Sequence, residues 1–229
     1  MGVVGSFLLD KYREEETGSF HFKHHYILHA LDSQILLLLL QGIREKRAID
    51  VTMVSVRKEK EVCHAVCPLN LLISTQTGRQ YLLCYHYRFR RPMILRMDNI
   101  HSVKMGNAEK NYEKYFGYGE KFRENLWGVS SGADYSLDHI ELIVHVEPWE
   151  GYIVDRLQRE KRCGSVEAVD ERTYRFAADV YDASEMLPWL RTFTGRVEKL
   201  ECSNPAVNER FYGDLKQMQA MYGGEDHGV

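Results

Sequence analysis

Residues 80–92 read Gln-Tyr-Leu-Leu-Cys-Tyr-His-Tyr-Arg-Phe-Arg-Arg-Pro, and the alternation over residues 80–89 is typical of a β-strand. Successive strand side chains point to opposite faces, so one face carries Tyr81, Leu83, Tyr85, Tyr87 and Phe89. The other face carries Gln80, Leu82, Cys84, His86 and Arg88. The same period recurs in residues 48–56, 61–75 and 92–105. Four strands in under 60 residues predict a small, strongly bent antiparallel sheet or barrel and exclude a βαβ array.

Helices are predicted on both sides of these strands. Asp32 or Ser33 can cap a helix that ends in residues 41–47, where cations complement its C-terminal dipole. Residues 107–132 combine Lys and Glu with several aromatic residues, which is typical of a helical connector. Residues 1–30 show no sustained period and predict a partly ordered lead-in.

The second half of the chain predicts a different domain. Its expected order is a strand at 140–146, a helix at 149–161, a hairpin at 165–180, a helix at 183–194, a strand, and a final helix at 208–221. The order β-α-β-β-α-β indicates a split-βαβ or ferredoxin-like arrangement, so the fold class is α+β. The predicted boundaries are 1–30 for the lead-in, 31–106 for the linker helix and barrel, 107–138 for the connector, and 139–229 for the ferredoxin-like domain.

Composition indicates a soluble globular protein, with 44% hydrophobic and 28% charged residues. The longest apolar run, Ile35–Leu40, has six residues against the ~20 that a bilayer requires, so we expect no membrane span. The N-terminus lacks the basic region of a secretory signal, and five cysteines suit free thiols, which predicts a cytoplasmic protein. The net charge of −3 divides into +5 for residues 1–106 and −8 for residues 107–229.

Motifs for catalysis or metal binding lack their usual context. Residues 128–132 match G-x-S-x-G, but no buried strand precedes the serine and no helix follows, so a flexible turn is expected. Cys63 and Cys67 lie four residues apart on a predicted strand, too far for a disulfide. The histidines at 21, 24, 25 and 29 lack further zinc ligands nearby. Asp98, the one acid of the barrel region after Glu61, is expected to be a salt-bridge partner. We therefore expect no enzyme, metal or cofactor.

The segment from His86 to Lys104 contains five Lys and Arg residues and one acid. Cations beside aromatic rings suit phosphate neutralisation and base stacking, the two contributions that stabilise the binding of single-stranded nucleic acid. The alternative is that the aromatic rings fill the barrel while the arginines only solvate its rim.

Three short motifs carry a resemblance to a known family. Residues 66–72 read Val-Cys-Pro-Leu-Asn-Leu-Leu, residues 78–83 read Gly-Arg-Gln-Tyr-Leu-Leu, and residues 95–100 read Leu-Arg-Met-Asp-Asn-Ile. Their order and spacing resemble the WYL domain family, whose pattern is a proline before a leucine pair, a W-Y-L tripeptide and an F-R-L-D-R-I-like closing strand. The resemblance implies an Sm/SH3-like barrel. The second half resembles the C-terminal extension called WCX, so that the two cover residues 30–222.

The resemblance also implies a function. WYL proteins are mostly bacterial transcriptional regulators, usually homodimers, whose barrel senses a ligand, in some cases single-stranded nucleic acid or a nucleotide. DNA is normally read by an N-terminal helix-turn-helix domain. This chain has no room for one before the helix at Asp32, so we expect that the gene product lacks it or that the chain is a fragment.

The ligand pocket carries over to this chain residue by residue. Tyr81 matches the motif tyrosine, and Arg96 matches the arginine of the closing strand. Gln80 replaces the tryptophan, Asn99 stands where a second arginine is usual, and Met93 replaces a basic residue found in many members. The candidate ligand-binding residues are Tyr81, His86, Arg88, Arg90, Arg91, Arg96, Asn99 and Lys104. The departures favour a second hypothesis, a protein-interaction accessory with a vestigial pocket.

Overall fold

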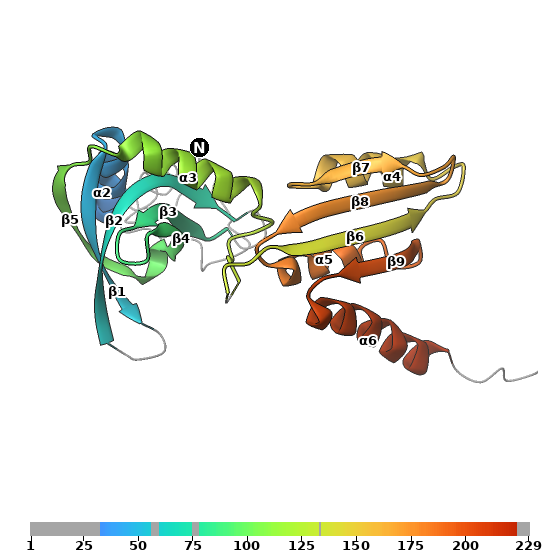
Figure 1. Cartoon of the computed structure of the whole chain (residues 1–229). Coiled ribbons are helices and arrows are strands. Elements are labelled where there is room, and N and C mark those ends of the chain that lie inside the picture. The colour runs from blue at the N-terminus through green and yellow to red at the C-terminus, as the bar shows by residue number, and fades with distance from the viewer. Residues whose placement is uncertain (1–32, 56–59, 75–77, 133, 224–229) are drawn as a thin grey trace, which may run out of the picture. The chain divides into compact units, whose positions relative to one another are not determined.

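The computed structural model describes residues 33–55, 60–74, 78–132 and 134–223. The chain divides into two compact units at Phe122 and Arg123, and each is an α+β unit built on an antiparallel sheet (Figure 1). The α+β class predicted from the sequence is therefore confirmed. The lead-in and its histidines lie outside the described residues. Within the described part, no helix has the length and apolar character that crossing a membrane requires.

The first sheet has the strand order β4-β3-β2-β1-β5. Its strands are β1 (Arg47–Ser55), β2 (Lys60–Ile73), β3 (Gln80–His86), β4 (Arg91–Arg96) and β5 (Ile100–Ala108). The predicted first helix is α2 (Ser33–Arg44), which buries Ile35, Leu36 and Leu39 against the sheet. These positions recur every three to four residues, as expected for a helix with one apolar face.

Two predicted strand boundaries are wrong. The segment predicted as one strand over 92–105 is two strands, because the 3-10 turn η2 (Met97–Asn99) interrupts it. The strand predicted to reach Phe89 ends at His86, since residues 87–90 form the turn of the β3–β4 hairpin. Arg90 sits in the left-handed region of backbone conformation with φ of 53°, which a strand does not accommodate.

The described strands form an open sheet in which β4 and β5 are the two edges, and no ladder joins these edges. A closed barrel is thus not seen among the described residues. The concave face buries Leu82 and Cys84 of β3 together with Val51, Val66 and other apolar side chains of the sheet.

Helix α3 (Tyr112–Glu124) covers the opposite face of β3 (Figure 1). The ring of Tyr115 stacks on that of Tyr85, with 4.0 Å between centroids and 8° between planes. One turn later, a Cβ at Gly119 would lie 2.7 Å from Leu69 Cδ1 and 3.7 Å from Leu83 Cδ2. The absence of a side chain at Gly119 therefore lets the helix lie close to the sheet.

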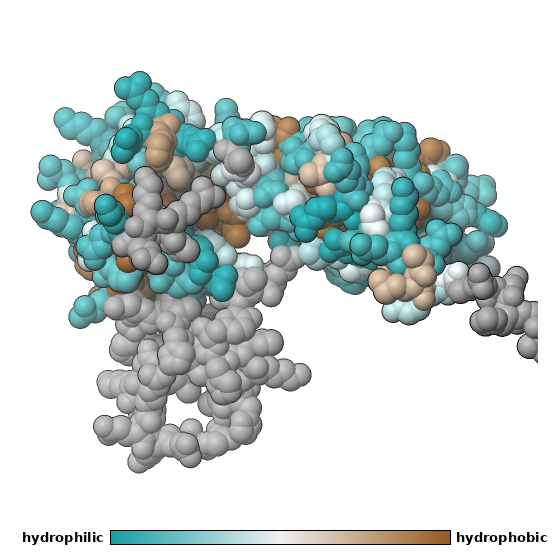
Figure 2. Space-filling model, turned by 90° about the horizontal axis from the view of Figure 1, so that it is seen from below, coloured by the Kyte–Doolittle hydropathy of each residue, from teal (hydrophilic) through white to brown (hydrophobic). Residues whose placement is uncertain are grey.

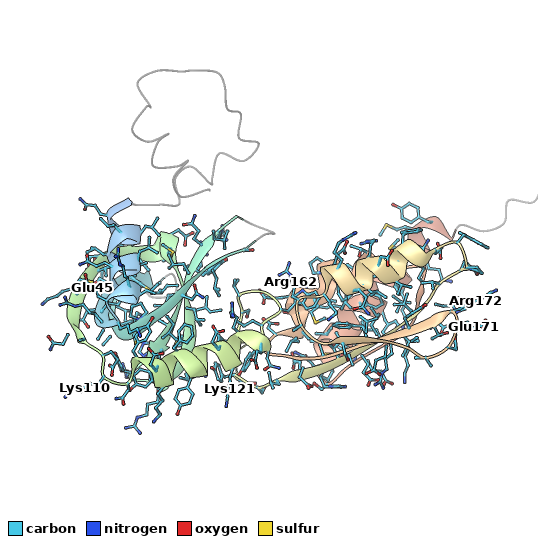
Figure 3. The ribbon with its side chains drawn as sticks, turned by 90° about the horizontal axis from the view of Figure 1, so that it is seen from above. Glu45, Lys110, Lys121, Arg162, Glu171 and Arg172 are labelled. Atoms are coloured by element: carbon cyan, nitrogen blue, oxygen red, sulfur yellow. The ribbon has the colours of Figure 1, made fainter. Side chains whose placement is uncertain are left out.

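The second unit has the strand order β7-β8-β6-β9, with β6 (Asp138–His145), β7 (Ser165–Ala168), β8 (Thr173–Val180) and β9 (Val197–Cys202). Its helices are α4 (Gly151–Glu160), the 3-10 turn η3 (Ala183–Met186), α5 (Leu187–Arg191) and α6 (Pro205–Tyr222). Along β6 the residues Ile140, Leu142 and Val144 are fully buried while their neighbours are not, so the period of two holds. Glu171 and Arg172 lie at the predicted turn between β7 and β8 (Figure 3).

Candidate nucleic-acid interface

Residues 86–91, here called the hairpin tip, place three arginines around an exposed phenylalanine. Phe89 is 50% exposed, and the guanidinium carbons of Arg88 and Arg91 each lie 6.0 Å from its ring centroid. Arg90 is exposed on the same turn. A guanidinium this close to a ring is within reach of a cation–π contact, which stabilises the open ring between two charges. The tip therefore offers cationic groups beside a ring that a flat ligand can reach.

Two of the three arginines of the hairpin tip, Arg88 and Arg90, are not balanced by a carboxylate of the described residues. Between Tyr85 and Met97 the sequence has four arginines and no acid. Among the described residues, no carboxylate lies within ion-pair distance of Arg88 or Arg90. The nearby Tyr87 donates its hydroxyl to Glu109 Oε2 at 2.7 Å, which keeps both groups engaged with each other.

Beneath the tip, His86 and His64 form a hydrogen-bonded pair. His64 Nδ1 lies 2.9 Å from His86 Nε2, and the Phe89 backbone N–H donates to His86 Nδ1 at 3.4 Å. His86 is only 3% exposed. Burial lowers the pKa of both rings, and His64, Arg88 and Arg91 lower that of His86 further. Both rings are therefore neutral at pH 7.

The other end of the hairpin, here called the hairpin base, contains Tyr81, Arg96, Asp98 and Asn99. Tyr81 and Arg96 are cross-strand neighbours, so the two residues carried over from the family motif do lie together. Arg96 Nε donates to Asp98 Oδ1 at 3.0 Å, and Nη2 donates to Oδ2 at 2.5 Å. This contact raises the pKa of Arg96 and lowers that of Asp98. The salt bridge expected for Asp98 is present, and it occupies the face of the guanidinium that a phosphate would bind.

The candidate residues do not converge on one site. Arg91 and Arg96 stand at opposite ends of β4, about 17 Å apart at the usual rise per residue. Lys104 lies on β5, at the other edge of the sheet, opposite Asp50 of β1. The tip holds His86, Arg88, Arg90 and Arg91; the base holds Tyr81, Arg96 and the half-buried Asn99.

The tyrosines of β3 are not open to a ligand. Tyr81 and Tyr85 are 7% and 8% exposed, and Tyr85 is stacked under Tyr115 of α3. Both rings are thus packed within the first unit, on the face of β3 opposite the core residues Leu82 and Cys84, and Tyr85 lies beneath α3. Lys114 of α3 and Arg90 both act on the buried Tyr85 hydroxyl, so Lys114 adds a further cation on this side of the hairpin.

Sequence reasoning placed neither Phe89 nor His64 among the site residues. Phe89 stands between two arginines in the sequence, and that pattern could have indicated an exposed ring. His64 carries no comparable pattern, because its partner lies 22 residues away on another strand.

The G-x-S-x-G segment holds a carboxylate. The backbone N–H groups of Val129 and Ser130 donate to the two carboxylate oxygens of Glu185 at 3.1 and 3.0 Å. A Cβ at Gly128 would lie 2.5 Å from the same carboxylate, so a side chain there would displace the carboxylate. The motif forms a structural turn in which the serine Oγ accepts from the Gly132 N–H.

Metal binding finds no support in the described parts of the chain, since no three His, Cys, Asp or Glu side chains there are grouped to hold an ion. All five cysteines are free thiols. Burial raises the pKa of Cys67 to about 12, which keeps that thiol protonated and unreactive.

Comparisons with known proteins match this architecture. Residues 34–105 match the family model of the WYL domain. A solved CRISPR Cas-related protein is similar in fold, with a TM-score of 0.51 and 10% identity over 82% of this chain and 51% of that one. PafBC, proteasome accessory factor B/C of Arthrobacter aurescens, matches with a TM-score of 0.40 and 14% identity over 90% of this chain and 29% of that one. The chain therefore spans about half of the first structure and under a third of the second. No curated protein sequence matches the chain.

The first unit is thus a small α+β domain, a five-stranded antiparallel sheet with a linker helix and a basic β3–β4 hairpin. The family match makes the assignment specific for this part of the chain, which contains a WYL domain at residues 34–105.

Proposed function

We propose that the chain is a non-enzymatic regulatory module that binds single-stranded nucleic acid or a nucleotide at the hairpin tip. One observation carries this proposal: Phe89 is half exposed between Arg88 and Arg91, with both guanidinium carbons 6.0 Å from its ring. A base can stack on such a ring, and the guanidinium groups can neutralise the flanking phosphates. The WYL domain supports a regulatory role, because its relatives are mostly transcriptional regulators.

The tip is a better ligand site than the base. At the base, a phosphate has to displace Asp98 from Arg96, whereas Arg88 and Arg90 at the tip face no competing carboxylate among the described residues. Arg96 is consequently a secondary contact, made only by a nucleic-acid strand long enough to extend from the tip to the base. Lys104 is too far along the sheet to share the same phosphate.

In this proposal the second unit binds a partner and relays the signal of ligand binding from the first unit. Its element order and its strand order β7-β8-β6-β9 support the ferredoxin-like interpretation, and the five-stranded antiparallel order of the first sheet supports the Sm/SH3-like interpretation. A homodimer and a cytoplasmic location complete the proposal.

The test is fluorescence anisotropy of labelled single-stranded DNA and RNA oligomers against the purified chain across a salt series. Wild-type binding is expected to weaken as salt rises, because counterions are released from the strand. Phe89→Ala is expected to weaken binding by about tenfold, the loss of one stacked base. Phe89→Tyr keeps the ring and is the matched control.

Binding that is absent at low salt, or equal in Phe89→Ala and wild type, would show that the tip is not the site. Arg159→Ala removes an exposed charge from α4 and controls for net charge alone. Its affinity is expected to equal that of wild type.

A second candidate function, a protein-interaction accessory, is favoured by the exposed aromatic residues of the second unit. Trp149 and Tyr152 are 76% and 54% exposed at the start of α4. Much of the surface visible in Figure 2 is hydrophilic. Large exposed apolar side chains on such a surface are typical of docking contacts. Partner binding through Trp149 would be nearly insensitive to salt, which separates the two functions.

A further inference from the structure

Two neutral histidines and one backbone amide form a chain of hydrogen bonds under the hairpin tip. The Phe89 N–H can only donate, so His86 Nδ1, 3.4 Å away, must carry no proton. A neutral ring has one N–H, so that proton sits on His86 Nε2 and is donated to His64 Nδ1 at 2.9 Å. His64 in turn carries its proton on Nε2. Each ring thus has one possible tautomer.

An added proton breaks this chain wherever it goes. If His64 gains a proton on Nδ1, two N–H groups face each other between the rings. If His86 switches tautomer to accept that proton, its Nδ1–H then faces the Phe89 N–H. The backbone of the tip is fixed partly through these bonds, together with the Arg90 N–H donating to the His86 carbonyl at 2.8 Å.

The surroundings of the pair contain cations and apolar groups. Arg91 is the cross-strand neighbour of His86, and Arg88 lies on the adjoining turn. On the other side, His64 is opposite Val51 of β1, which is itself paired with Val103 of β5. Asp50 is the charged residue of β1 next to Val51, and strand alternation turns it to the other face. Within the described part of the chain, no carboxylate forms a hydrogen bond or an ion pair with either ring, so none stabilises a protonated pair.

We infer that His64 is a positioning residue of the hairpin tip, and that it makes ligand binding there weaken as the pH falls. The inference rests on the proposed function, because it concerns the same ligand site. At pH 7.5 the neutral pair holds Phe89 and its flanking arginines in place. As the pH falls, protonation releases the tip, even though it adds positive charge near an anionic ligand.

The direction of the effect separates this role from simple electrostatics. If the histidines acted only as additional cations, lower pH would strengthen the binding of a nucleic acid. If they position the tip, lower pH weakens it. The two roles therefore predict opposite slopes of affinity against pH.

The experiment measures the anisotropy of a labelled oligothymidylate at fixed ionic strength between pH 5.5 and pH 7.5. Wild type is expected to lose about tenfold in affinity over this range, the effect of one unit of pKa difference between the bound and released states. His64→Asn keeps an acceptor near the Nδ1 position without titrating. It is expected to bind like wild type at pH 7.5 and to lose about threefold or less at pH 5.5, because His86 still titrates. His64→Leu removes the acceptor and is expected to bind more weakly at both pH values.

The positioning role is also tested without ligand. The protection factors of the Phe89 and Arg90 amides, from hydrogen exchange, are expected to fall with pH in wild type and much less in His64→Asn. An affinity that rises at pH 5.5, or protection factors that change equally in both proteins, would overturn the inference. No binding at any pH, with protection factors that still depend on His64, would overturn the proposed ligand and leave the positioning of the tip standing.

Discussion

Arg96 at the base of the β3–β4 hairpin and Arg88 and Arg90 at its tip belong to one basic run, but their surroundings differ. At the base, Asp98 holds the Arg96 guanidinium through two hydrogen bonds. At the tip, no carboxylate of the described residues holds Arg88 or Arg90, and an exposed ring stands beside them. The difference teaches that the number of cations in a segment does not locate an anion site. An arginine that is already paired with a carboxylate of the same chain must first lose this carboxylate before it can bind an anion.

The largest effect is expected from removing charge at the tip. Arg88→Ala combined with Arg90→Ala should weaken binding of a single strand by roughly 50-fold at low salt, as two charge-assisted contacts are lost. The slope of log affinity against log salt should fall by about 1.4. Anisotropy titrations measure both quantities.

The matched control combines Arg159→Ala with Arg210→Ala, two exposed arginines of the second unit. If this pair weakened binding as much as the tip pair does, the ligand would respond to net charge and not to the tip.

The next largest effect is expected in helix α3, which covers β3 between the hairpin tip and the hairpin base. Gly119→Ala should lower the free energy of unfolding by about 1–2 kcal/mol, because the new Cβ would lie 2.7 Å from the buried Leu69. Gly117→Ala, two residues away on α3, meets no atom within 4 Å and should raise stability by up to about 1 kcal/mol. Urea unfolding followed by tyrosine fluorescence compares the two. Equal effects would mean that α3 does not pack as described.

A smaller effect is expected from releasing Arg96 at the base. Asp98→Asn removes the competing charge, and binding of a strand long enough to reach the base should tighten by about threefold. A short oligomer that covers only the tip is the internal control and should bind unchanged. Weaker binding of both oligomers would indicate that Asp98 supports the fold of η2 instead.

The smallest effect concerns the histidines of the two units, whose pKa values shift in opposite directions. Contact with Asp179 at 2.8 Å raises the pKa of His139, so this pair stabilises the second unit below pH 6.5 and loses its contribution as the pH rises through the raised value. Burial lowers the pKa of His64 and His86, so their contribution is present above pH 6.5 and is lost as the pH falls.

Because His139 is exposed, His139→Gln should change stability by under about 0.5 kcal/mol at pH 5.5 and by less at pH 8. Urea midpoints at the two pH values measure it, with His101→Gln, an exposed histidine of β5, as the control. A larger loss at pH 8 than at pH 5.5 would contradict the assigned direction.

Much of the fold follows from periodicity. The first helix, the order of strands and the β-α-β-β-α-β sequence of the second unit are read from side-chain alternation and from turn residues, which act locally. The interruption at Met97–Asn99 is not read in this way, because Met97 continues the alternation of buried residues begun by Leu95 while the backbone already turns. The end of β3 at His86 depends on the backbone of Arg90, which residue type alone does not reveal.

The site was less predictable, for a physical reason. Alternation assigns Tyr81 and Tyr85 to one face of a strand but does not say whether that face meets a ligand or a helix. Here α3, 30 residues further along the chain, covers it through Tyr115. The pairing of His64 with His86 likewise depends on the register of two strands, and no local pattern fixes that register.

The three tryptophans, at 127, 149 and 189, all belong to the second unit, while the rings packed around β3 are tyrosines. Trp127 and Trp189 are buried, with ring centroids 4.7 Å apart, and Trp149 faces solvent. Excitation at 295 nm consequently reports on the second unit alone, because the WYL domain has no tryptophan and contributes no emission. A change in tryptophan emission when an oligonucleotide binds at the tip would therefore show directly that ligand binding to the first unit alters the second unit.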